Sequence, residues 1–409
     1  MMSYLLPRFG LALPACLLQV WLSVGYGSPD GSNPVSQPVR STLSPEQIRQ
    51  HAVGLIRGNL GALLEDPEVY LQTARKECKY FPEGAVYPYV MPACAYVNLA
   101  LAGVIPKKEA IPKVRALLMM GIQEVAGTVH APGGDLLKIR PDNTSGSFLG
   151  ILNMGLSAYG LISDDNHFKA INDHLCETFL AWFEAKGGAS LQSWPNVVWH
   201  MDTTFALASL DLWKTPGQKA RVKAAYASHL KWRKRHVTLA NGLPVANDRR
   251  RETRGCDLAP QIACLANMDP AYSKQLYTAF CQRHWVDYGF LYGFTEWEKG
   301  LSAGAFGDID SGPVFMEIGG TASGFGIAIA KAMGDQHRYN RLLYELNWVS
   351  SFIRAAPSSE FGRNMLSWIS RNVPGGLDPK YYSGFLYGDA FLFYTLTWTP
   401  WREGNLRGK

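Results

Sequence analysis

The sequence predicts an all-α fold, an (α/α)6 barrel in which about six helical hairpins form a toroid. Three observations predict it. Beyond residue 43 the chain consists of segments with the apolar periodicity of helices, separated by loops rich in Gly and Pro, with almost no alternating strand pattern. Apolar segments alternate with segments that carry charges on one face, as the inner and outer helices of a two-layered ring should. The hairpins also recur weakly, roughly every 60 to 80 residues.

The first predicted element is a helix over residues 44–65. Ser44, Pro45 and Gln47 combine a capping box with a proline at the first helical position. Apolar periodicity predicts further helices, so that twelve helices make six hairpins. Their predicted ranges are 88–103, 108–127, 147–162, 165–185, 201–213, 217–236, 256–267, 270–288, 312–333, 336–354 and 385–398.

Composition separates two kinds of helix among these segments. The segments rich in Gly, Ala, Ser and Leu, predicted to be inner helices, are 147–162, 201–213, 256–267 and 312–333. The charged segments, predicted to be outer helices, are 165–185, 217–236, 270–288 and 336–354. Asp165, Asp269 and Asp335 are each expected to cap an outer helix. An open α-solenoid would give a similar pattern, but the irregular repeat and the long loops favour a closed ring.

The N-terminal region has the pattern of an export signal. Arg8 supplies a positive charge before the apolar run 9–24, which predicts a signal peptide over residues 1–27. A flexible linker rich in Ser, Pro and Asn is predicted over 28–43, followed by a single barrel domain over 44–400. We therefore expect a periplasmic or secreted protein with no integral membrane segment after signal cleavage.

Charge and motifs limit the partners that the sequence supports. The chain has 40 basic and 34 acidic residues, and its only dense basic run, 248–254, contains acidic residues as well, so no nucleic acid partner is predicted. There is no Walker loop, dinucleotide fingerprint, GxSxG or HExxH motif, and the cysteines lack metal-ligand spacing. We therefore expect a small-molecule substrate and neither a cofactor nor a metal.

In a two-layered ring, the loops that enter the inner helices lie on one rim and converge on a central cavity. One such loop contains Asp308 and Asp310, just before a predicted helix. One of the two aspartates is expected to be the helix cap. A helix N-terminus lowers the pKa of a nearby carboxyl group, so the capping aspartate would act as a hydrogen-bond acceptor or a base. A purely structural role for both is the alternative.

A second loop, residues 193–202, combines two indoles, an imidazole and a carboxyl group. Trp194 and Trp199 are expected to form an apolar wall, beside which the pKa of Asp202 should rise until the carboxyl can act as a general acid. The alternative is an Asp202 that only caps the helix 203–213. His200 is a second candidate proton carrier, or a packed residue.

Other rim residues are candidates for substrate binding. Arg254 is expected either to hold a substrate carboxylate or to pair with Asp257, and the aromatic side chains of Tyr87, Trp297 and Tyr387 are expected to stack on the substrate. Asp202 together with Asp308 or Asp310 would provide an acid and a base in one pocket. Such a pair suits glycosidic cleavage or alcohol dehydration.

Four segments carry a resemblance to a known family. Residues 150–156, 195–210, 268–273 and 328–336 follow in an order that resembles the bacterial linalool dehydratase/isomerase family, in particular its uncharacterised relatives. The resemblance implies an (α/α)6 barrel and a periplasmic, cofactor-free, homo-oligomeric enzyme that works by acid–base chemistry.

The family's catalytic residues do not match in identity. Its two catalytic cysteines fall on Asp202 and Ser193 here, and its histidine falls on Ile151. A carboxylic acid in place of a thiol keeps a proton carrier at that point of the cavity and changes its acid strength. The resemblance therefore implies acid–base chemistry at Asp202 and leaves the substrate open.

Three functions remain open from the sequence. The first is a dehydratase-like lyase or isomerase that acts on a small hydroxylated compound, such as an isoprenoid, with Asp202 as proton donor. The second is a carbohydrate-active hydrolase or lyase that uses a carboxylate pair. The third is a non-catalytic binding module, in which the rim aspartates are helix caps and the tryptophans belong to the core.

Overall fold

The computed structural model shows a mostly helical protein. The residues that it describes are 42–79, 84–129, 131–141, 145–213, 215, 217–249, 251–299, 311–312, 314–360, 362–364, 367 and 377–401. The predicted signal peptide, and the predicted linker up to residue 41, lie outside this part of the chain. No helix in the described ranges is both long enough and apolar enough to cross a membrane. The predicted all-α class is confirmed.

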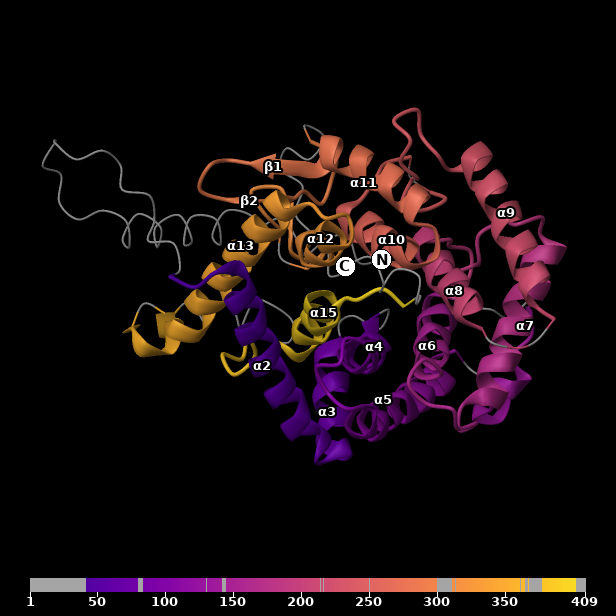
Figure 1. Cartoon of the computed structure of the whole chain (residues 1–409), viewed down its shortest axis with the longest axis horizontal. Helices are drawn as coiled ribbons and strands as arrows, with labels where there is room; N and C mark the ends of the chain where they lie inside the picture. Colours follow the sequence, from indigo (N-terminus) through magenta and orange to yellow (C-terminus); the bar gives the residue numbers. More distant parts are fainter. Residues whose placement is uncertain are drawn as a thin grey trace, which may run out of the picture.

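Six helices lie toward the middle of the molecule (Figure 1). They are α4 (Tyr87–Leu101), α6 (Gly146–Tyr159), α8 (His200–Leu212), α10 (Gly255–Met268), α12 (Gly320–Ala332) and α15 (Leu386–Thr397). Their contacts run in a cycle: α4 packs on α6, α6 on α8, α8 on α10, α10 on α12, α12 on α15, and α15 on α4. Almost every residue of α4, α6 and α10 is buried, as expected for helices that are covered on all sides.

The remaining long helices lie outside these six (Figure 1). They are α2 (Pro45–Leu64), α3 (Pro67–Cys78), α5 (Lys107–Thr128), α7 (Lys169–Ala185), α9 (Lys219–His236), α11 (Pro270–His284) and α13 (Gln336–Ala355). Each inner helix has an outer partner: α5 packs on α4, α7 on α6, α9 on α8, α11 on α10, α13 on α12, and α2 on α15. The outer helices bury one face only. In α9 the buried positions are Ala225, His229 and Arg233, one turn apart.

Short elements complete the described fold. The 3-10 helices are η2 (Pro132–Gly134), η3 (Leu136–Lys138) and η5 (Ala356–Ser358). Two antiparallel hairpins pair β1 (Trp285–Asp287) with β2 (Tyr292–Phe294), and β3 (Val314–Phe315) with β4 (Ile318–Gly319). In the second hairpin, both turn residues, Met316 and Glu317, have positive φ, which matches the twist of a tight hairpin.

Several helix starts follow the predicted capping chemistry. The capping box is present in α2, where Ser44 Oγ accepts from the Gln47 amide and the Gln47 side chain accepts from the Ser44 amide. Asp269 caps α11 and Asp335 caps α13. The predicted cap Asp165 is wrong: α7 begins at Lys169 without a side-chain cap, and Asp165 instead accepts from Arg115 and Tyr159.

Two predicted helices are too long because each overlaps a strand. The helix predicted from residue 312 begins at Gly320, since the preceding residues form β3 and β4. Its N-cap is Gly319, so neither Asp308 nor Asp310 caps it, and both aspartates lie outside the described residues. The helix predicted to reach residue 288 ends at His284, where β1 begins. In addition, α3 was not predicted, although Asp66 caps it.

Close helix packing fixes the first turns of α8 and α10. A Cβ added at Gly150 would lie 2.9 Å from the backbone oxygen of Asp202, and one added at Gly255 would lie 2.3 Å from the backbone oxygen of Thr295. Only glycine permits these approaches. The two glycines thereby position the N-termini of two neighbouring inner helices.

Candidate active site

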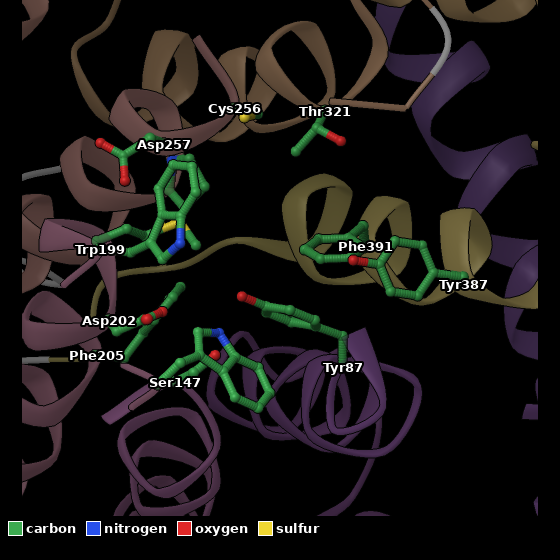
Figure 2. A pocket seen from close by; sticks show the side chains of 13 residues that line it. Tyr87, Ser147, Trp199, Asp202, Phe205, Cys256, Asp257, Thr321, Tyr387 and Phe391 are labelled. Carbon is green, nitrogen blue, oxygen red and sulfur yellow. The ribbon is translucent and has the colours of Figure 1, made fainter. Parts of the chain in front are cut away.

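A pocket lies where the N-terminal turns of the six inner helices meet (Figure 2). It is partly open to solvent. Its lining residues are Tyr87 of α4, Ser147 of α6, Met201, Asp202 and Phe205 of α8, Cys256, Asp257 and Pro260 of α10, Thr321 of α12, Tyr387 and Phe391 of α15, and Trp194 and Trp199 of the loop before α8. Helix N-termini carry partial positive charge, so this end of the molecule favours negative charge.

Asp202 is the third residue of α8 and is 2 % exposed. Burial raises the pKa of its carboxyl from 3.8 to about 7, while a hydrogen bond with Ser193 opposes that rise. The helix N-terminus also favours the anion, but the loss of hydration dominates. The carboxyl therefore binds its proton more tightly than an exposed aspartate does and can donate it near neutral pH.

Asp257 occupies the equivalent third position of α10 and is also 2 % exposed. Burial raises its pKa well above the ordinary value, the charge of Asp202 raises it further, and the charges of Arg233 and Arg254 oppose the rise. Gln261 Nε2 donates to Asp257 Oδ2 at 2.7 Å, whereas Oδ1 has no hydrogen-bond partner among the described residues. Because the two carboxyl groups interact, they titrate as a pair. We call Asp202 and Asp257 the carboxyl pair.

Six of the thirteen side chains that line the pocket are aromatic. Tyr87 packs on Phe391 with ring centroids 4.8 Å apart, and edge-on against Tyr387 at 6.0 Å. Trp199 stands on the opposite side of the pocket (Figure 2). In the same view the hydroxyl end of Tyr87 and the carboxyl end of Asp202 point toward each other across the pocket. The structure thus brings five of the predicted site residues together in one pocket: Tyr87, Trp194, Trp199, Asp202 and Tyr387.

Arg254 does not line the pocket, and its ion pair differs from the predicted pairing with Asp257. Its Nη2 lies 2.6 Å from Glu296 Oε1, in a pair that is almost fully buried. The guanidinium lies 5.6 Å from the ring centroid of Trp199 and 5.7 Å from that of Trp297, which also lies outside the pocket lining. The Cys256 thiol donates to the same Glu296 oxygen at 3.0 Å. Arg254 therefore supports one wall of the pocket from behind.

His200 points away from the pocket. Its Nδ1 lies 2.9 Å from Ser190 Oγ, and its ring lies near that of Trp232 on α9. Burial, together with the charge of Arg233, lowers its pKa to about 3, so the imidazole is neutral. Two residues along a helix are separated by about 200° of rotation, which is why His200 and Asp202 face opposite sides. The predicted role of His200 as a proton carrier finds no support in this placement.

Sequence reasoning missed Asp257 and Cys256 as pocket residues. The available signal was positional: Asp202 and Asp257 both stand in the first turn of a predicted inner helix. Asp308 and Asp310 lie outside the described residues. Among the described residues, the second carboxyl group that lines the pocket with Asp202 is that of Asp257. In the described part of the chain, no three His, Cys, Asp or Glu side chains are grouped so that they could hold a metal ion.

Comparison of the chain with models of known protein families and with curated proteins gives no match.

Proposed function

We propose that this protein is an acid–base enzyme, a dehydratase-like lyase or isomerase that acts on a small, largely apolar hydroxylated compound such as an isoprenoid alcohol. We further propose that its helical hairpins close into an (α/α)6 barrel, as the contact cycle of the six inner helices supports. The chemistry that we propose needs only the carboxyl pair. A periplasmic or secreted location and a homo-oligomeric state are parts of the same proposal.

The observation that carries the proposal is the carboxyl group of Asp202. It lines an aromatic pocket, it is 2 % exposed, and burial raises its pKa to about 7. A carboxylic acid with that pKa is matched to proton donation near neutral pH. Asp257 in the same pocket provides a second carboxyl group, so that an acid and a base can be present together.

The proposed reaction begins with proton transfer from the Asp202 carboxyl to the hydroxyl oxygen of the substrate. The C–O bond then breaks, water leaves, and positive charge develops on carbon. The π faces of Trp199, Tyr87 and Phe391 stabilise that charge. The carboxyl pair next takes a proton from the neighbouring carbon, and the C–H electron pair forms the double bond. The products are an alkene and water, and addition of water at another carbon gives the isomerised alcohol.

The pocket favours a small molecule over a polymer. Most of the lining side chains are aromatic or aliphatic, as in sites that bind a small, largely apolar ligand. A polysaccharide-processing site is expected to be a longer groove with more hydrogen-bonding side chains. A carbohydrate substrate is therefore the second outcome to be tested, rather than a second proposal.

The test is turnover of a mixed panel of monoterpene alcohols and oligosaccharides, followed by mass spectrometry. The purified protein is compared with Asp202→Asn and with Asp164→Asn, a matched change at an exposed aspartate in the loop before α7. New hydrocarbons or rearranged alcohols that disappear only in Asp202→Asn support the proposal. Sugar fragments that depend on Asp202 would instead identify a carbohydrate-active enzyme. Binding without turnover of either class would identify a binding module.

A further inference from the structure

A buried cation stands behind the pocket on the outer helix α9. The side chain of Arg233 is 2 % exposed, and no carboxylate of the described residues lies within ion-pair distance of it. Its Nη2 instead donates to Gln261 Oε1 at 2.5 Å. A buried charge without a countercharge is strongly destabilising, so a negative charge nearby must compensate this guanidinium.

Gln261 connects this cation to the pocket. Its side chain is fully buried, and its Nε2 donates to Asp257 Oδ2 at 2.7 Å while its Oε1 accepts from Arg233. A guanidinium can only donate, so Arg233 fixes the amide with its oxygen toward α9 and its nitrogen toward Asp257. The hydrogen bonds therefore run without interruption from the outer helix to a pocket carboxyl group.

The other described groups around Asp257 leave the carboxyl pair as the countercharge. Arg254 already has Glu296 as an ion-pair partner. His200 on α8 and His229 on α9 have pKa values lowered to about 3 by burial and by Arg233, so both are neutral. On α8, the charge of Asp202 raises the pKa of Asp257, and the backbone amide of Met201, which carries no net charge, lowers it. Neutrality of this buried region requires one negative charge on the pair.

We propose that Arg233 is a positioning residue that acts through Gln261 to keep one member of the carboxyl pair ionised, so that the pair holds a single proton at neutral pH. That state provides the acid and the base that the reaction needs at the same time. The inference rests on the proposed function for its purpose, but the charge state itself can be measured without a substrate.

The test is a pH titration of the aspartate carboxyl carbons by 13C NMR, with signals assigned from Asp202→Asn and Asp257→Asn. In the wild-type protein we expect one protonated and one ionised carboxyl group at pH 7. In Arg233→Met the first ionisation of the pair should move up by about one pH unit or more, since a nearby cation lowers a carboxyl pKa by that order. Arg233→Lys keeps the charge and should restore most of the wild-type titration.

Two further variants make the test decisive. Arg235→Met removes an exposed cation of the same helix and should leave the titration unchanged. Gln261→Glu keeps the shape of the bridge and gives Arg233 its own carboxylate, so that both members of the pair should be protonated at pH 7. This variant keeps a partner for the buried cation and decides the question if Arg233→Met does not fold.

The outcomes separate this inference from the proposed function. Wild-type titration in folded Arg233→Met or Gln261→Glu would overturn the inference and leave Arg233 as a structural tie between α9 and α10. The expected shift would support it even if no compound of the panel is turned over, in which case the proposed function alone fails.

Discussion

Replacement of Asp202 by asparagine should stabilise the protein at neutral and alkaline pH. In the unfolded chain the carboxyl ionises near its ordinary pKa of 3.8, whereas in the folded protein burial raises the pKa to about 7. Between these values the folded state holds a proton that the unfolded state has lost, so rising pH favours unfolding. The difference is about three pH units at about 1.36 kcal/mol each, which gives about 4 kcal/mol. Asparagine cannot ionise and avoids this loss.

The measurement is the free energy of unfolding from urea denaturation at pH 4, 6 and 8, followed by tryptophan fluorescence. Asp202→Asn and the wild-type protein should agree within about 1 kcal/mol at pH 4, and the variant should become more stable as pH rises, up to about 4 kcal/mol at pH 8. Asp164→Asn, the exposed control, should show no such pH-dependent gain. A gain that is constant with pH, or that grows toward acid, would refute burial as the cause of the raised pKa.

Three other predictions concern the pocket and its supports. Because Asp202 must be protonated to donate, kcat/KM for any substrate found should fall as pH rises through about 7. A kcat/KM that does not change between pH 6 and 8 would contradict the role of Asp202 as the acid. Gly150→Ala should destabilise the protein by about 1 to 3 kcal/mol, since its Cβ would lie 2.9 Å from the Asp202 backbone oxygen. Gly58→Ala, at an exposed position of α2 with no atom within 4 Å, should instead stabilise it by about 0.5 to 1 kcal/mol. Thermal denaturation should show a lower midpoint for the first variant and a higher midpoint for the second. Asn153→Ala should lower the free energy of unfolding by about 1 to 3 kcal/mol, because it removes a buried amide that donates to Ser209 Oγ at 2.9 Å. If the variant unfolds at the same urea concentration as the wild-type protein, this hydrogen bond does not contribute to stability.

Helix positions were largely predictable from the sequence because their signals are local. Ser44 with Gln47, Asp269 and Asp335 cap helices as expected, since a cap needs only its own side chain and the next turn of backbone. Asp165 does not cap α7 because the helix begins only at Lys169; its Oδ1 accepts from the His167 amide before the helix, and its Oδ2 accepts from Tyr159 and from Arg115 on another helix. Hydrogen-bond partners on other helices cannot be recognised from the local sequence pattern.

The two strand hairpins were missed for a similar reason. The backbone amide of Glu296 donates to the carbonyl oxygen of Glu317, and Thr295 forms a bridge with Ile318. The segment before α12 is therefore extended because it pairs with residues about twenty positions earlier in the chain. Two- and three-residue strands are too short to show alternating polarity. The predicted start of this helix was therefore wrong, and with it the expected capping by Asp308 or Asp310.

The sequence by itself determined the helical class, the alternation of apolar and charged helices, and the candidacy of Asp202 beside two tryptophans. Only the tertiary structure decided that Asp257 shares the pocket with Asp202, that His200 faces away, and that Arg254 pairs with Glu296. The physical reason is that capping and periodicity act within a few residues. The hydration that a carboxyl group loses, and the charge that compensates it, depend on side chains brought together from several separate helices.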